Sequence, residues 1–386
     1  MSGQRPEEAA ERNHAGRPST PERNSVSGRL RTPLTELVGI EHPVVQTGMG
    51  WVAGPRLVAA TANAGGLGIL ASATMTFEEL EAAVAKTKSL TGKPFGVNIR
   101  ADATDAGERI ELLIREQVRV ASFALAPKKD LIARLKDAGV VVVPSIGAAK
   151  HAVKVASWGA DAVIVQGGEG GGHTGPVATT LLLPSVLDAV DIPVIAAGGF
   201  FDGRGLAAAL SYGAAGVAMG TRFLLTQEST VPEAVKQEYL ARGLQDTVVS
   251  VKVDGMPHRM LNTELVTRLE HSGGWRGLSA AVSNAAKFKS MTGMKWSTLM
   301  RDGLAMRKTK DLSWSQVVMA ANSAMLTKAG LVEGRTDAGV LPAGQVTGII
   351  DSLPTVAELI DGIVADALAR IEAVSALTIE PAAEAH

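Results

Sequence analysis

A short apolar run, a turn and an alanine-rich amphipathic stretch recur eight times between residues 43 and 224. The apolar runs predict strands at 43–46, 67–71, 94–99, 118–125, 139–145, 161–166, 192–197 and 214–220. Helical periodicity follows several of them, at 77–89, 106–116, 129–138 and 205–212. Strands that alternate with helices form βα units around a parallel sheet. Eight such units predict an α/β fold of the closed (β/α)8, or TIM barrel, type.

An open, doubly wound sheet is the alternative architecture, because GGGHTG at 170–175 matches the GxGxxG pattern of dinucleotide-binding folds. That pattern requires a tight turn from a strand directly into a helix. Here the match begins several residues after the strand at 161–166, and Pro176 follows it at once. We therefore favour the barrel.

The strand–helix pattern ends near Thr226, and helical segments follow it. Four regions are expected: a disordered extension at 1–30, a barrel core at 31–226, a helical cap at 227–325 inserted after the eighth strand, and a return to the barrel at 326–378 with a last amphipathic helix at 355–376. The helical segments expected in the cap lie at 231–242, 263–270, 278–287, 295–306 and 313–325, with one β-like run at 247–255.

The cap is locally basic, with thirteen Lys or Arg against six Asp or Glu between Lys236 and Lys310. This excess fits either a solvated cover or a lid that meets an anionic substrate. Over the whole chain the formal net charge is only −1, which argues against nucleic acid or a membrane surface as partner. No apolar run approaches the ~18–20 residues of a membrane span, and the polar first thirty residues lack a secretory apolar segment. A cytoplasmic location is expected.

Two glycine turns follow the last two predicted strands, AAGGF at 196–200 and MGTR at 219–222. Barrels often bind phosphate with the loops after strands seven and eight, where backbone N–H groups can ligate a dianion. Either turn alone would be explained by a tight βα connection. Together they predict a phosphate site made by Gly198, Gly199, Gly220 and the hydroxyl of Thr221.

Further polar and flexible residues lie where other strands end, at the face of the barrel where active sites form. Met49, in the QTGMGW loop at 46–51, can lie against a planar ring, and Asn98 and Gln166 offer amides to its edge. His173 lies in the glycine loop QGGEGGGHTG at 166–175, where it can act as acid, base or electrostatic stabiliser. Glu169 is either a second acid–base group or an ordinary charged loop residue.

The sequence carries no signal for a metal site or for thiol chemistry. The chain has no cysteine, which excludes disulfides, thiolate nucleophiles and Cys-based metal sites. The histidines at 42, 151, 258 and 271 show no HExxH-like spacing. We therefore predict no metal site.

The loop QGGEGGGHTG resembles the QGxEAGGHxG signature of the nitronate monooxygenase (2-nitropropane dioxygenase-like) superfamily, which includes the flavin-dependent enoyl reductases of fatty-acid synthesis. The resemblance extends over about residues 31–350 and includes AGGLG at 64–68, FGVN at 95–98, AAGGFFDGRG at 196–205 and GQVTG at 344–348. It implies a barrel that binds FMN and carries a late helical insertion. By the same resemblance Gly198, Gly199, Gly220 and Thr221 hold the FMN phosphate, Met49, Asn98, Gln166, Gly171, Gly172 and Gln345 complete the cofactor site, and His173 is the active-site histidine.

Three departures weaken an assignment to nitronate oxidation itself. Gly170 stands where the signature has alanine, the first-strand motif QTGM lacks a proline before its methionine, and the late segment reads PAGQVTG. The opening RTPLTELVGIEHPVVQTGMGW and the long basic cap are more similar to an actinobacterial branch associated with steroid ring-C/D degradation. Members of that branch act on bicyclic acyl-CoA thioesters.

Four functions follow as hypotheses. The first is an FMN-dependent dehydrogenase or reductase of an acyl-CoA, with Lys252, Arg259, Arg268, Lys287 and Lys289 as candidate contacts of the CoA phosphates. The second is a nitronate monooxygenase, and the third is a barrel that binds flavin or a sugar phosphate without redox activity, or a barrel isomerase or lyase. The fourth is an enoyl reductase acting on a carrier protein. NAD(P)H as electron partner and a homodimer remain open options.

Overall fold

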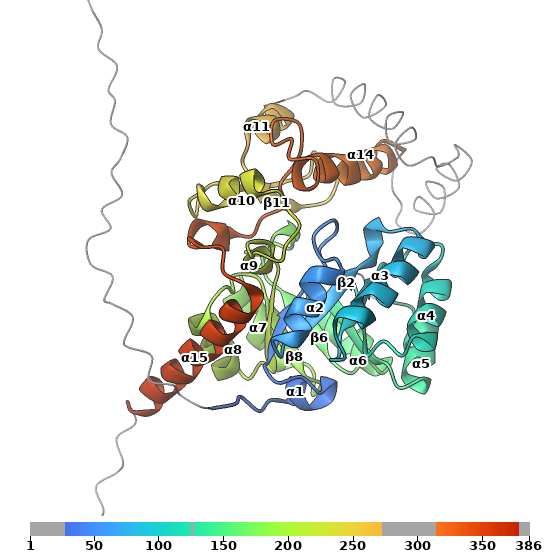
Figure 1. Ribbon diagram of the computed structural model, residues 1–386, viewed down its shortest axis with the longest axis vertical. Coiled ribbons are helices and arrows are strands. Elements are labelled where there is room, and N and C mark those ends of the chain that lie inside the picture. The colour runs from blue at the N-terminus through green and yellow to red at the C-terminus, as the bar shows by residue number, and fades with distance from the viewer. Residues whose placement is uncertain (1–27, 125–126, 272–313, 378–386) are drawn as a thin grey trace, which may run out of the picture.

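Eight parallel strands close into a barrel at the centre of the protein (Figure 1). The computed structural model describes residues 28–124, 127–271 and 314–377. Each strand pairs with its neighbour, and the first pairs with the last, so the sheet has no free edge. The strands are β1 Val44–Gln46, β2 Leu67–Ala71, β3 Gly96–Ile99, β4 Val120–Phe123, β5 Val141–Ile146, β6 Val163–Gln166, β8 Val194–Ala197 and β9 Gly216–Met219. All eight predicted strands are confirmed, and with them the TIM barrel.

Helices surround the barrel and bury their apolar faces against the strands (Figure 1). They are α2 Pro55–Asn63, α3 Phe77–Leu90, α4 Ala106–Arg115, α5 Lys129–Asp137, α6 Ala149–Ser157, α7 Thr179–Leu187, α8 Gly203–Tyr212, the short α9 Thr221–Leu224 and α15 Val356–Ser375. The last of these packs along α8 and also contacts α2, so the C-terminal segment completes the ring after the cap. Thr355 begins it with a capping box to Glu358, as the sequence pattern predicts.

The barrel interior is a packed core that is closed at its N-terminal end. Side chains of alternate strand positions, among them Val45, Ile69 and Ile195, form one buried cluster. Helix α1 (Pro33–Val38) adds Leu34 and Val38 to that cluster from below the strands (Figure 1). The opposite end, where the strands terminate, is therefore the open one.

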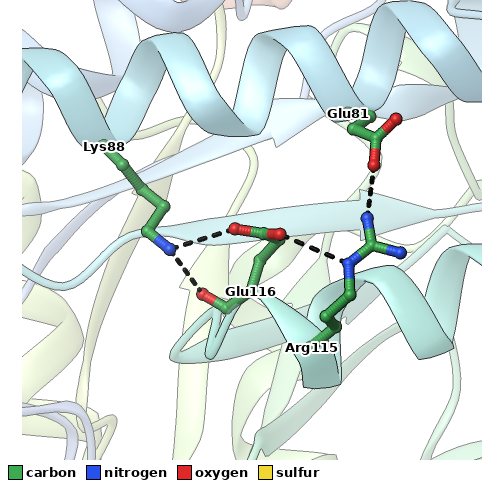
Figure 2. Close-up of polar contacts among 4 residues, drawn as sticks. All are labelled: Glu81, Lys88, Arg115 and Glu116. Carbon is green, nitrogen blue, oxygen red and sulfur yellow. Dashed lines mark hydrogen bonds and ion pairs between the residues drawn. The ribbon is translucent and has the colours of Figure 1, made fainter.

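A small ion-pair network joins α3 to the end of α4 on the outer surface (Figure 2). Lys88 Nζ lies 3.1 Å from Glu116 Oε2, and Arg115 pairs with both Glu81 and Glu116. Hydrogen bonds from Lys88 and Arg115 lower the pKa of Glu116. Exposed pairs of this kind contribute little to stability, so the network ties α3 to α4 but adds little to the free energy of folding.

The cap lies over the open end of the barrel, on the side opposite α1 (Figure 1). Its described elements are α10 Glu233–Leu240, β10 Thr247–Ser250, β11 His258–Leu261, α11 Glu264–His271 and α14 Trp314–Leu331. The helices predicted at 278–287 and 295–306 lie outside the described residues, as do residues 1–27 of the predicted extension. Within the described residues, no helix is long and apolar enough to cross a membrane.

Two features of the cap differ from the sequence prediction. The β-like run at 247–255 is the first strand and turn of an antiparallel hairpin, β10–β11. The glycine loop, predicted as irregular, contains a short strand, β7 (Gly172–His173), which pairs with β11. Glycine has little intrinsic strand preference, and the partner that makes β7 extended lies more than eighty residues later in the chain.

Candidate active site

A cavity of about 410 Å³ opens at the C-terminal ends of the strands, beneath the cap. Its volume lies within the range of small-molecule and cofactor sites. The predicted residues that line it are Met49, Asn98, Gln166, Gly171, Gly172, His173, Gly198, Gly199, Gly220 and Thr221. Gln345 is not among the lining residues, although its neighbours Gly344 and Val346 are. Its backbone N–H donates to the carbonyl oxygen of Glu169, 3.0 Å away, and so joins the return segment to the glycine loop.

The side chain of Gln166 holds the glycine loop in place. Its amide nitrogen donates to the carbonyl oxygen of His173 at 2.8 Å, and more weakly to that of Gly171. A Cβ atom on Gly170 would lie 2.6 Å from that same nitrogen, which gives a physical reason for glycine where related signatures have alanine. Because the amide donors are engaged with the loop, Oε1 is the group of Gln166 left for a bound ring.

Glu169, considered from the sequence as an acid–base group or a charged loop residue, has a structural role in the glycine loop. Its carboxylate accepts hydrogen bonds from the backbone N–H and the hydroxyl of Thr179, at 3.0 and 2.8 Å. Thr179 is the first residue of α7, so the carboxylate caps the positive end of that helix. The contact fixes the first half of the glycine loop against the barrel.

The two glycine turns after β8 and β9 line the cavity beside the mouth of β1. Gly198 and Gly199 adopt left-handed backbone angles, with φ of 90° and 85°. A Cβ atom on Gly220 would come within 3.4 Å of Thr47 Oγ1 and 3.5 Å of Met49 Sδ, both on residues that line the cavity. Thr221 Oγ1 accepts a hydrogen bond from Gly344 N–H at 2.9 Å, which leaves the hydroxyl proton free to be donated. This cradle fits the phosphate end of a nucleotide cofactor.

A buried carboxylate from the cap joins two histidines at the edge of the cavity. Asp254 Oδ2 lies 2.6 Å from His173 Nε2 and 3.6 Å from His258 Nδ1. The two imidazole rings are 4.8 Å apart, centre to centre. His173 and His258 occupy paired positions on β7 and β11, and Asp254 lies in the loop between β10 and β11. The cap hairpin therefore delivers two of the three groups to the glycine loop.

The electrostatics of this cluster keep Asp254 ionised. Burial alone raises its pKa, but the hydrogen bond from His173 and the neighbouring His258 ring outweigh burial and bring the pKa well below its ordinary value. The second carboxylate oxygen, Oδ1, accepts the backbone N–H of Met256 at 3.1 Å. An ionised carboxylate can only accept, so neutral His173 carries its proton on Nε2 and presents Nδ1 as the basic nitrogen.

Sequence reasoning overlooked Asp254 and His258 as site residues. The Asp254–Gly255 pair is a hairpin-turn signal, but it lies within the run at 247–255 that the sequence pattern predicts as β-like. Reading it as a turn would have predicted β11 and placed His258 on a strand. Spacing along the chain, on which the predicted absence of a metal site rests, gives no information about residues that meet through the β7–β11 pairing and the β10–β11 loop.

The candidate CoA contacts on the cap have different surroundings. The Arg259 guanidinium donates from Nε to the carbonyl oxygen of Gly168 at 3.0 Å and from Nη1 to Thr247 Oγ1 at 3.0 Å. It thus fastens the hairpin to the glycine loop, and the residue is half-buried. Lys252 and Arg268 are exposed, and Lys287 and Lys289 lie outside the described residues.

Comparison with known proteins places these features in context. A family model described as nitronate monooxygenase matches residues 31–110 and 103–366. A Rhodococcus jostii (strain RHA1) protein named (3aS,4S,5R,7aS)-5-hydroxy-7a-methyl-1-oxo-octahydro-1H-indene-4-carboxyl-CoA dehydrogenase is 80% identical over 348 residues, 90% of this chain and 99% of the relative. A protein of the same name from Mycobacterium tuberculosis (strain ATCC 25618 / H37Rv) is 73% identical over 352 residues, with the same coverage. Among solved structures, FabK from Thermotoga maritima is 33% identical with a TM-score of 0.74, covering 90% of this chain and 100% of its own.

Proposed function

The chain belongs to the nitronate monooxygenase family of flavin-dependent oxidoreductases, and from that premise we propose that it is an FMN-dependent dehydrogenase of an acyl-CoA intermediate of steroid ring degradation. The observation that carries the proposal is the Asp254-held His173 at the edge of a cavity with a phosphate cradle. The substrate class is inferred from the names of the two relatives, which describe a hydroxylated bicyclic carboxyl-CoA.

Oxidation of a secondary alcohol removes a hydride from carbon and a proton from oxygen. Bound FMN supplies the two-electron acceptor for the hydride. His173 Nδ1 accepts the hydroxyl proton, and the Asp254 carboxylate stabilises the imidazolium that forms. Gly198, Gly199, Gly220 and Thr221 would hold the FMN phosphate, while Met49, Asn98, Gln166, Gly171 and Gly172 would line the ring.

The cap is proposed to bind the CoA portion. The exposed Lys252 lies in the same interstrand loop as Asp254, and Arg268 is exposed on α11. Positive side chains at this position can pair with the phosphates of CoA while the acyl group enters the cavity. Because Arg259 is engaged with the glycine loop, its contribution is to hold that loop against the cap.

The direct test is anaerobic mixing of the oxidised enzyme with the hydroxylated bicyclic carboxyl-CoA that names the relatives. We expect the flavin absorbance to bleach within seconds of mixing. The corresponding ketone should be the product. The free acid without CoA serves as the matched control and should reduce the flavin far more slowly. If the flavin remains oxidised with the thioester, the dehydrogenase proposal is wrong.

Two alternatives are supported by specific observations and are tested in the same apparatus. The match to a nitronate monooxygenase model favours oxygen consumption with propionate-3-nitronate. The similarity to FabK, and to flavin enoyl reductases by motif, favours flavin reduction by NADH or NADPH followed by reduction of an enoyl thioester. We expect a nitronate rate near background and slower reduction by either nicotinamide than by the acyl-CoA.

Replacing Asp254 with asparagine should lower kcat about tenfold or more, because the amide cannot stabilise an imidazolium as a carboxylate does. Asp254 acts through His173 and touches no substrate in the proposal, so KM should change little. Asp246→Asn, at an exposed aspartate beside the same hairpin, is the control and should leave kcat unchanged. Equal kcat values for the two variants would remove Asp254 from the mechanism.

A further inference from the structure

His258 is a buried histidine whose ring nitrogens form no hydrogen bond with the described residues, although its Nδ1 lies 3.6 Å from Asp254 Oδ2. The residue is 5% exposed, and neither ring nitrogen has a hydrogen-bond partner within the described part of the chain. A buried polar group without a hydrogen-bond partner destabilises a fold. Its ring nevertheless lines the cavity and lies beside Asp254 and His173. The ring nitrogens of His258 are therefore available to a ligand in the cavity.

The three side chains form a compact set of donor atoms. One nitrogen from each histidine and one oxygen of Asp254 all lie within 4.8 Å of one another. Two imidazoles and one carboxylate are the ligands that Zn²⁺ and similar transition metals take in open, three-ligand sites. Asp254 also has the supporting contact typical of such sites, since its other oxygen is held by the Met256 N–H.

We propose that His173, Asp254 and His258 bind one divalent transition-metal ion of the zinc type. The ion takes the place of the proton now shared between His173 Nε2 and Asp254 Oδ2, and it satisfies His258. Its remaining coordination position faces the cavity that both histidines line. Small side-chain rotations suffice, because the histidine nitrogens must approach each other from at most 4.8 Å to the spacing that ~2.0–2.1 Å metal–nitrogen bonds allow.

Bound metal should inhibit the enzyme reversibly, and this part of the inference rests on the proposed function. If His173 takes the substrate proton with support from Asp254, a metal ion on both residues withdraws that support. Zinc added to the active enzyme should therefore lower kcat, and a chelator should restore it. Binding itself does not depend on which reaction the enzyme catalyses, so it is measured separately.

The test is calorimetric titration of Zn²⁺ into the chelator-treated, flavin-loaded protein and into three alanine variants, at His173, His258 and His151. His151 is exposed on α6, away from the cluster, and is the matched control. We expect one ion per chain, with affinity at least about tenfold weaker in the first two variants and unchanged in the third. His173 is more than half exposed, so its variant tests the site even where the buried His258→Ala disturbs packing.

Two results would overturn the proposal: no binding of stoichiometric zinc by the unaltered protein, or equal affinity in His173→Ala and His151→Ala. If zinc binds as expected but leaves flavin reduction by the acyl-CoA unaffected, the metal site stands and the assigned role of His173 is wrong. If the unaltered enzyme shows no acyl-CoA oxidation at all, the function fails while the calorimetric result still decides the metal site.

Discussion

Alanine in place of His173 is expected to lower turnover by about 10²-fold or more while FMN stays bound, the scale of lost acid–base catalysis. The side chain supplies the basic nitrogen and the contact to Asp254, at 2.6 Å. The contacts that shape the loop come from the backbone of residue 173: its carbonyl accepts from Gln166, and β7 pairs with β11. Alanine retains both, so cofactor binding should survive.

The measurement is steady-state kcat together with the flavin-to-protein ratio from absorbance. His151→Ala removes an exposed histidine elsewhere and should leave both quantities unchanged. Free imidazole should restore part of the activity of His173→Ala, because the deleted side chain leaves room at the edge of the cavity. If the turnover of His173→Ala equals that of the unaltered enzyme, His173 has no catalytic role.

The sequence predicts the barrel because each βα unit has its own local strand and helix pattern. A run such as 161–166 is apolar and β-branched because its strand is buried on both faces, and the helix that follows has its own periodicity. The strand ends then place Met49, Asn98, Gln166 and the glycine turns on one face without any long-range information. That is why ten of the eleven predicted site residues line the same cavity.

The second half of the site depends on contacts between distant segments, and local patterns do not encode these. His173 contacts Asp254, which lies 81 residues later in the chain. His258 lies beside His173 only because β7 pairs with β11. Arg259 illustrates the same limit for charge. The sequence counts its positive charge among those that can meet an anionic substrate, yet in the fold its guanidinium donates to the Gly168 carbonyl and to Thr247. Composition reveals a basic cap but not which of its cations are free.

Leucine at Gly220 should abolish most FMN binding without unfolding the protein. Gly220 has a φ of −103°, which any residue can adopt, so the substitution adds no left-handed strain. Its Cβ would project between Thr47 Oγ1 and Met49 Sδ, at 3.4 and 3.5 Å, and the remaining carbons must then extend into the cavity. We expect the flavin content of the purified protein to fall by about tenfold or more. A tenfold loss of affinity corresponds to about 1.4 kcal/mol of FMN binding free energy.

The matched control is Gly362→Leu, on the exposed face of α15, where an added Cβ meets nothing within 4 Å. It should keep full flavin and stabilise the fold by up to about 1 kcal/mol, because glycine is a poor helix residue. Flavin content from absorbance and the apoprotein melting temperature separate a blocked site from a damaged fold. Gly220→Leu with a normal melting temperature and an undiminished flavin ratio would mean that the cofactor phosphate does not bind between β1 and β9, and that the glycine turns serve the barrel's connections alone.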